Sequence, residues 1–128
     1  MKEKLLDLHK NSYSPYSNFK VSAVVVMRDG SQFCGVNVEN ASYGAAICAE
    51  RSAIVSAVSA GYKKGQFMEL NVMVSSGEIG WPCFACRQVI MEFFNKDAIV
   101  RAWTTTGEYE EHTVAELCPY PFDSEDLK

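Results

Sequence analysis

The chain has 128 residues, of which 48% are hydrophobic and 22% are charged. This length and composition predict one globular domain over residues 1–128 and exclude a disordered chain. The net charge of −4 argues against a basic surface that binds a nucleic-acid polymer. No apolar run is long enough for a membrane helix and the N-terminus has no signal-peptide core, so we expect a soluble, cytoplasmic protein without a membrane partner.

The first part of the chain predicts a helix followed by a hairpin. Leucines with flanking charges over residues 5–8 indicate a helix that ends near residues 11–13, before a turn-like Ser-Pro pair. The β-branched run over residues 21–27 and the segment 32–38 predict two strands. The turn residues Asp29-Gly30 lie between them, so we expect the strands to pair antiparallel.

In the rest of the chain, predicted helices alternate with predicted strands. The Ala-rich segment 48–60 has helical spacing and ends before Gly61, and residues 87–94 predict a second central helix. Further strands are expected at 70–74, 99–104 and 108–112, and a capped helical turn at 113–117. This alternation predicts an α/β fold whose sheet is covered on both faces. The hairpin makes that sheet mixed.

The five cysteines stand at positions 34, 48, 83, 86 and 118. In a chain without an export signal they are more typical of thiols or metal ligands than of disulfides. Cys83 and Cys86 form a C-x-x-C, which by itself fits a metal chelate, a redox pair or simple packing. Cys34 and Cys118 have no partner at ligand spacing, so we expect them to be buried as small apolar residues.

Two short segments stand out because each begins a predicted central helix: Cys48-Ala49-Glu50 and Pro82 to Cys86. In an α/β sheet such helix starts converge at the crevice where ligands bind. Three thiolates would then hold one zinc ion with a fourth position for water, within reach of Glu50 as a proton carrier. One alternative is a noncatalytic zinc module that uses Cys34 or Cys118 as fourth ligand. Another is a thioredoxin-like redox pair formed by Cys83 and Cys86, which assigns no role to Glu50.

These residues resemble the cytidine deaminase family, in its small homotetrameric branch that binds zinc with three cysteines. The resemblance covers nearly the whole chain through the stretches SPYSNF (14–19), NVENASY (37–43), CAER (48–51), CFACRQ (83–88) and PFDSEDL (121–127). Zinc deaminases share an H-x-E and P-C-x-x-C signature, with Cys replacing His in this branch. The resemblance implies a three-layer α-β-α sandwich around a mixed sheet of about five strands.

The family's activity is the zinc-dependent hydrolytic deamination of cytidine, and of deoxycytidine, to uridine or deoxyuridine and ammonia in pyrimidine salvage. The resemblance implies that Cys48, Cys83 and Cys86 bind Zn²⁺. Glu50 would move protons between water, ring N3 and the departing amine. Because three thiolates and Zn²⁺ sum to a negative charge, Arg51 is expected to offset that charge by donating to the sulfurs.

The resemblance also implies two groups of substrate contacts. Those within one subunit are Phe19, Asn37, Glu39 and Ala49. Those that would reach into a neighbouring subunit's site are Ala41, Tyr43 and Phe122. Because Asn37 and Glu39 would hydrogen-bond ribose hydroxyls, the substrate is expected to be a nucleoside rather than a free base. The shared sites of a homotetramer predict that a monomer is inactive.

The chain departs from the family at two aromatic residues beside the metal motif. Phe84 stands where the family usually has Gly, and a positive φ there would strain the backbone. Trp81 is also unusual. Both residues bear on substrate preference more than on reaction type. Two alternative substrates stay open: a blasticidin-type nucleoside antibiotic, and cytosine within RNA or DNA, which the acidic charge disfavours.

Overall fold

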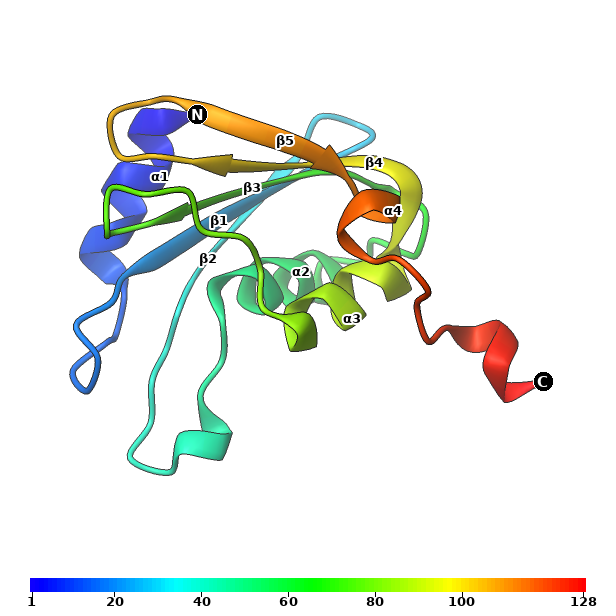
Figure 1. Cartoon of the computed structure of the whole chain (residues 1–128), viewed down its shortest axis with the longest axis horizontal. Helices are drawn as coiled ribbons and strands as arrows, with labels where there is room; N and C mark the ends of the chain where they lie inside the picture. The colour runs from blue at the N-terminus through cyan, green and yellow to red at the C-terminus, as the bar shows by residue number, and fades with distance from the viewer.

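A computed structural model describes residues 1–128 as a five-stranded sheet with helices on both faces (Figure 1). The helices are α1 (Lys2–Leu8), α2 (Ala49–Ser59), α3 (Phe84–Phe93) and α4 (Val114–Leu117), with short 3-10 turns η1 (His9–Asn11), η2 (Tyr43–Ala45) and η3 (Ser124–Leu127). The strands are β1 (Val21–Met27), β2 (Gln32–Val36), β3 (Phe67–Val74), β4 (Phe94–Trp103) and β5 (Tyr109–Thr113). Their order is β2-β1-β3-β4-β5, with β3 and β4 parallel and the other pairs antiparallel. The predicted mixed sheet is confirmed.

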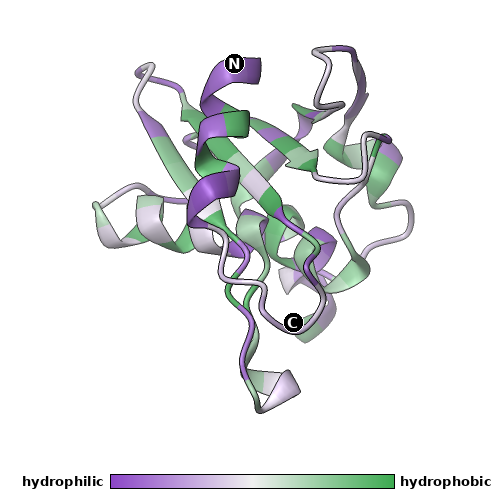
Figure 2. Cartoon of the chain, turned by 90° about the vertical axis from the view of Figure 1, so that its left-hand side faces the viewer, coloured by the Kyte–Doolittle hydropathy of each residue, from purple (hydrophilic) through white to green (hydrophobic).

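Side chains alternate across the central strands and divide the core between two faces. On one face, Ala23 and Val25 belong to the larger buried cluster, which α2, α3 and α4 cover. On the other face, Val24 and Met73 pack against Leu5 of α1. Figure 1 shows α1 on the opposite side of the sheet from α2 and α3, which confirms the three layers. In Figure 2 the hydrophobic colour concentrates in the central strands, while α1 is mostly hydrophilic.

Both central helices begin at a cysteine. Cys48 is the N-cap of α2 and Cys83 is the N-cap of α3, each with extended backbone. Helix α3 starts at residue 84 rather than at the predicted 87, because the backbone N–H of Arg87 donates to the carbonyl oxygen of Cys83 (2.9 Å) and closes a first turn that includes the C-x-x-C. The predicted stop of α2 is confirmed at Gly61, whose φ is +102°.

The prediction was wrong at Phe94, which begins β4 instead of ending a helix. Its backbone is extended (ψ 148°), it pairs with Phe67 of β3, and the two ring centroids lie 5.2 Å apart. This pairing starts β4 five residues before the predicted strand. Regular β2 ends at Val36, two residues short of prediction, and Val38 forms isolated bridges instead. No helix of the structure combines the length and the apolar character that crossing a membrane requires.

Candidate metal centre and active site

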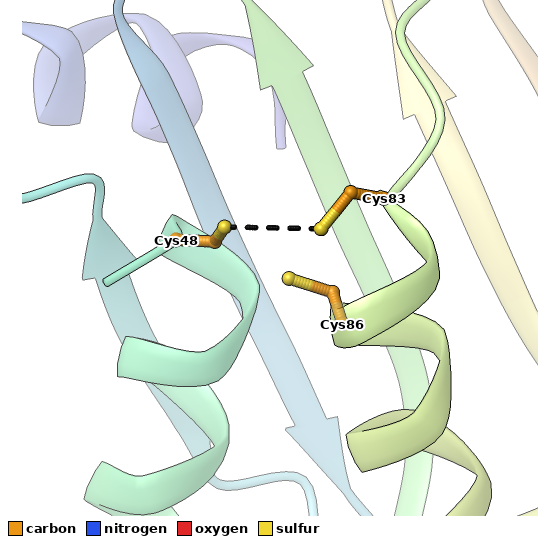
Figure 3. A group of neighbouring side chains, drawn as sticks. All are labelled: Cys48, Cys83 and Cys86. Carbon is orange, nitrogen blue, oxygen red and sulfur yellow. Dashed lines mark hydrogen bonds between the residues drawn. The ribbon is translucent and has the colours of Figure 1, made fainter. Parts of the chain in front are cut away.

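Three cysteine sulfurs point toward one another where α2 and α3 begin (Figure 3). Their Sγ atoms all lie within 4.8 Å of one another, and those of Cys48 and Cys83 are 4.0 Å apart. A tetrahedral zinc ion with Zn–S bonds of about 2.3 Å separates two sulfurs by about 3.8 Å, so the cluster fits one zinc ion. Neither Cys34 nor Cys118 belongs to the cluster, which counts against the zinc module with four protein ligands.

The start of α2 comes close to β2 because residue 35 is glycine. A Cβ atom on Gly35 would lie 2.4 Å from both the Ala49 carbonyl oxygen and the Ala53 backbone nitrogen. A larger residue would therefore push away the turn of α2 that carries Cys48 and Glu50. This role of Gly35 was not predicted from the sequence, although a glycine inside a strand is a known signal of close backbone approach.

Arg51 lies one turn beyond Cys48 and donates through Nη2 to its sulfur at 3.5 Å. Hydrogen bonding with Cys86, together with the Arg51 guanidinium, lowers the pKa of Cys48 to about 5. The N-termini of α2 and α3 add partial positive charge at the same place. These groups favour the Cys48 thiolate, whereas the hydrogen bond with Cys48 and burial raise the pKa of the Cys86 thiol. The Arg51 contact has the geometry that charge compensation requires.

Glu50 is buried beside the thiol cluster. Its side chain is 5% exposed, and Oε2 lies 3.8 Å from the Cys86 sulfur. Burial raises the pKa of the Glu50 carboxyl above its ordinary value. A raised pKa makes the carboxyl a stronger base than an exposed glutamate, which suits a group that takes up and returns a proton in general acid–base catalysis.

A cavity of about 480 Å³ adjoins the thiol cluster, and this volume lies in the usual range for small-molecule sites. The predicted site residues on its wall are Phe19, Asn37, Glu39, Tyr43, Cys48, Ala49, Glu50, Arg51 and Cys83. Cys86 is buried next to Glu50 instead of lining the cavity. Residues of four separate sequence segments thus meet around one space.

Two predicted contacts lie away from this cavity. Ala41 is exposed in the loop before η2. Phe122 follows α4, with 58% of its side chain exposed, and its carbonyl oxygen accepts a hydrogen bond from Gln88 Nε2 (2.8 Å). Tyr43, which was expected to reach a neighbour, lines the chain's own cavity with 79% of its side chain exposed. The reach of these residues into another subunit stays a prediction.

Asn37 and Glu39 connect the end of β2 to the loop that carries Phe19. Asn37 Oδ1 accepts from the backbone N–H of Val21 (3.0 Å), and Nδ2 donates to the Phe19 carbonyl oxygen (2.7 Å). The Glu39 carboxylate accepts from the Ser17 hydroxyl, which is the main reason that the pKa of Glu39 is lowered. Glu39 is therefore an ionised hydrogen-bond acceptor on the cavity wall.

The two unusual aromatic residues have different environments. Phe84 is the first residue of α3 and does not have a positive φ, so its bulk causes no backbone strain. Phe84 is 76% exposed, and the Arg87 guanidinium lies 4.6 Å from its ring centroid. Trp81 lines the cavity, and its ring centroid lies 5.0 Å from that of His112. Trp81 is thus the aromatic residue of the pair that bears on the shape of the cavity.

Comparisons with known proteins agree with this site. Residues 1–102 match the family model described as cytidine and deoxycytidylate deaminase zinc-binding region. The cytidine deaminase of Halalkalibacterium halodurans is 39% identical over 122 residues, which cover 95% of this chain and 91% of that protein. The cytidine deaminase of Sporosarcina psychrophila is 42% identical over 118 residues, with 92% and 85% covered.

A solved structure gives the same result. The crystal structure of cytidine deaminase from Burkholderia pseudomallei is similar with a TM-score of 0.89 and 41% identity, and the match covers 94% of each chain. The fold and the thiol cluster thus define the class as zinc-binding deaminases. Within that class, the chain belongs to the cytidine deaminase family. The resemblance stated from sequence is confirmed.

Proposed function

We propose that this protein catalyses the zinc-dependent hydrolytic deamination of cytidine to uridine and ammonia, and of deoxycytidine to deoxyuridine, in pyrimidine nucleoside salvage. The observation that carries the proposal is the buried Glu50 beside three clustered thiols at one cavity. The similar proteins named above are cytidine deaminases, which supports the same substrate and does not favour a blasticidin-type antibiotic.

In this proposal Cys48, Cys83 and Cys86 hold the zinc ion. Bound zinc supplies a Lewis acid that polarises water for attack on C4 of the pyrimidine. Three thiolates and Zn²⁺ together carry a net negative charge, which weakens that effect. Arg51, through its hydrogen bond to the Cys48 sulfur, offsets the charge together with the two helix N-termini.

Glu50 is the proposed catalytic acid and base. Its carboxylate takes the proton of the attacking water and gives it to ring N3. It then takes the second proton from the new C4 hydroxyl and passes it to the amine as the C4–N bond breaks, so that cytidine and water yield uridine and ammonia. Burial raises the pKa of Glu50, so the protonated carboxyl is less costly to form than in water, which supports its role as a proton carrier.

The remaining cavity residues are proposed to bind the nucleoside. Phe19 and Ala49 supply apolar surface for the pyrimidine, while Asn37 and Glu39 hydrogen-bond ribose hydroxyls. All four line the cavity that Glu50 also lines. A small nucleoside, not a nucleic-acid polymer, is therefore the proposed partner, and the net charge of −4 supports this.

The substrate assignment is tested by following ultraviolet absorbance and ammonia release with cytidine, deoxycytidine, cytosine and blasticidin S, with zinc quantified in the same sample. We expect turnover of the two nucleosides, and none of cytosine or blasticidin S. Glu50→Gln removes the proton carrier and keeps the side-chain size. We expect this variant to retain zinc and fold while ammonia release is lost. Cytidine turnover by a zinc-loaded Glu50→Gln protein would contradict the mechanism.

We propose that the protein works in the cytoplasm as a single-domain homotetramer with shared sites, in which Ala41, Tyr43 and Phe122 reach a neighbouring subunit. Thiolate ligands suit a reducing compartment. The high exposure of the Tyr43 and Phe122 side chains supports a neighbour that covers them, because exposed aromatic surface often marks interaction sites.

Subunit complementation tests the shared site. Phe122→Ala is expected to lose most activity with zinc retained. In this variant, the site around each Glu50 would lack the Phe122 ring of the neighbouring subunit. When this variant is dissociated and reassembled with Glu50→Gln protein, some sites in the hybrid combine an intact Glu50 with an intact Phe122. We expect activity to recover in the mixture and not in either protein alone. A mixture as inactive as its components would contradict the sharing of sites.

A further inference from the structure

Three hydrogen bonds from one loop occupy most of the Glu39 carboxylate. Oε1 accepts from the backbone N–H groups of Tyr16 (2.9 Å) and Ser17 (3.1 Å), and Oε2 accepts from the Ser17 hydroxyl. An ionised carboxylate offers about four lone-pair positions. One acceptor position therefore remains, and it belongs to Oε2, the oxygen that Ser17 holds.

The Ser17 hydroxyl also links two residues of the cavity wall. It accepts from the backbone N–H of Phe19 (3.0 Å) while it donates to Glu39. Phe19 and Glu39 line the cavity of about 480 Å³, whereas Ser17 lines an adjoining one of about 330 Å³. Ser17 therefore touches the side chain that is proposed to bind ribose without lining the nucleoside cavity itself.

We propose that Ser17 is a positioning residue that orients the Glu39 carboxylate so that Oε2 accepts one ribose hydroxyl. This inference rests on the proposed function, because it takes a nucleoside as the ligand. Without the Ser17 hydroxyl, the backbone bonds still hold Oε1, but Oε2 loses its partner and its fixed direction. The loss should affect a nucleoside that carries the hydroxyl bound by Glu39, and spare one that lacks it.

The lowered pKa of Glu39 agrees with this role. The hydrogen bond from Ser17 is its largest cause, so the hydroxyl favours the ionised carboxylate, which is a stronger acceptor than the neutral acid. The position of Ser17 two residues before Phe19 also ties the orientation of Glu39 to the loop that supplies the pyrimidine contact.

The test measures kcat and KM of wild type and Ser17→Ala with cytidine and its 2′-deoxy, 3′-deoxy and 5′-deoxy analogues. For cytidine we expect kcat/KM to fall about tenfold, mainly through KM, as for a lost hydrogen bond to a charged group that binds substrate throughout the reaction. One of the three deoxy analogues lacks the ribose hydroxyl that Glu39 binds. With that analogue, Ser17→Ala should lower kcat/KM by less than about twofold. Ser17→Thr keeps a hydroxyl and should restore most of the activity.

Glu39→Gln completes the comparison. If Ser17 acts through Glu39, then Ser17→Ala should have little further effect in the Glu39→Gln background. Ser76→Ala is the matched control, because Ser76 Oγ accepts from the N–H two residues later, as Ser17 does, but makes no hydrogen bond with Glu39. We expect the control to leave kcat and KM as in wild type. Should Ser17→Ala fold poorly, as judged by its Tm, Ser17→Cys is used in the same assays, because it keeps the size and weakens the donor.

Three results would overturn the inference: equal losses with all four nucleosides, additive losses in the double variant, or no loss at all. Each of them requires a wild type that deaminates cytidine. A zinc-loaded wild type without cytidine turnover would instead overturn the proposed function. The two failures are therefore distinguished by the wild-type assay alone.

Discussion

Cys48 and Glu50, two residues apart on the first turn of α2, have acidities shifted in opposite directions. The pKa of Cys48 is lowered by its hydrogen bonds with Cys86 and Arg51, while burial raises that of Glu50. One side chain is thereby suited to be an anionic ligand and the other to be a proton carrier. At the scale of residues, the proposed chemistry depends on these different surroundings more than on the residue types.

Arg51→Gln tests whether the guanidinium offsets the charge of the thiolates. We expect the fold and full zinc occupancy to remain, while kcat falls about ten- to a hundredfold, the effect of removing a charge-assisted hydrogen bond. Arg28→Gln removes an exposed arginine distant from the cavity and serves as the matched control. Wild-type turnover by zinc-loaded Arg51→Gln protein would show that Arg51 has no such role.

At the scale of elements, the site depends on how closely α2 approaches β2. Gly35 allows this approach, since the backbone of Ala49 and Ala53 occupies the space that a Cβ atom would need. The first turn of α2, with Cys48 as its N-cap, is thereby set against the sheet. Because interiors are packed without spare volume, even a methyl group at this position must move backbone.

Gly35→Ala is therefore expected to destabilise the protein by about 1–3 kcal/mol or more, as overpacking does, and to lower zinc content with it. Thermal unfolding and metal analysis measure the two effects. Gly30→Ala is the control in the same hairpin: Gly30 has a φ of +88° and open space around it, so substitution strains the backbone without contact with α2. We expect Gly30→Ala to retain zinc. A Gly35→Ala protein with wild-type Tm and zinc would refute this role for Gly35.

How far the sequence predicted each element depends on where its determinants lie. The β-branched run of β1 and the Ala-rich spacing of α2 are local patterns, and both elements formed where expected. The start of β4 at Phe94 depends on pairing with Phe67, a contact that no local pattern contains. The metal motif was visible as local spacing, whereas the link between Ser17 and Glu39 is a tertiary contact across 22 positions.

At the scale of the whole molecule, the fold brings together thiols that are far apart in the chain. Cys48 and Cys83 are 35 positions apart, yet their sulfurs lie 4.0 Å from each other because α2 and α3 begin side by side on one face of the sheet. Helix α1 covers the other face through Leu5. The two layers leave the helix starts accessible from the cavity, where substrate and metal would meet.

The most direct test of the account is the zinc content of purified protein, measured by elemental analysis together with cytidine turnover. We predict one zinc ion per chain in wild type, and loss of both zinc and turnover in Cys83→Ser. Cys118→Ser, which alters a thiol outside the cluster, should keep both. An active wild type without tightly bound zinc, or a Cys83→Ser protein with full zinc and full turnover, would contradict the assignment of the three cysteines as zinc ligands.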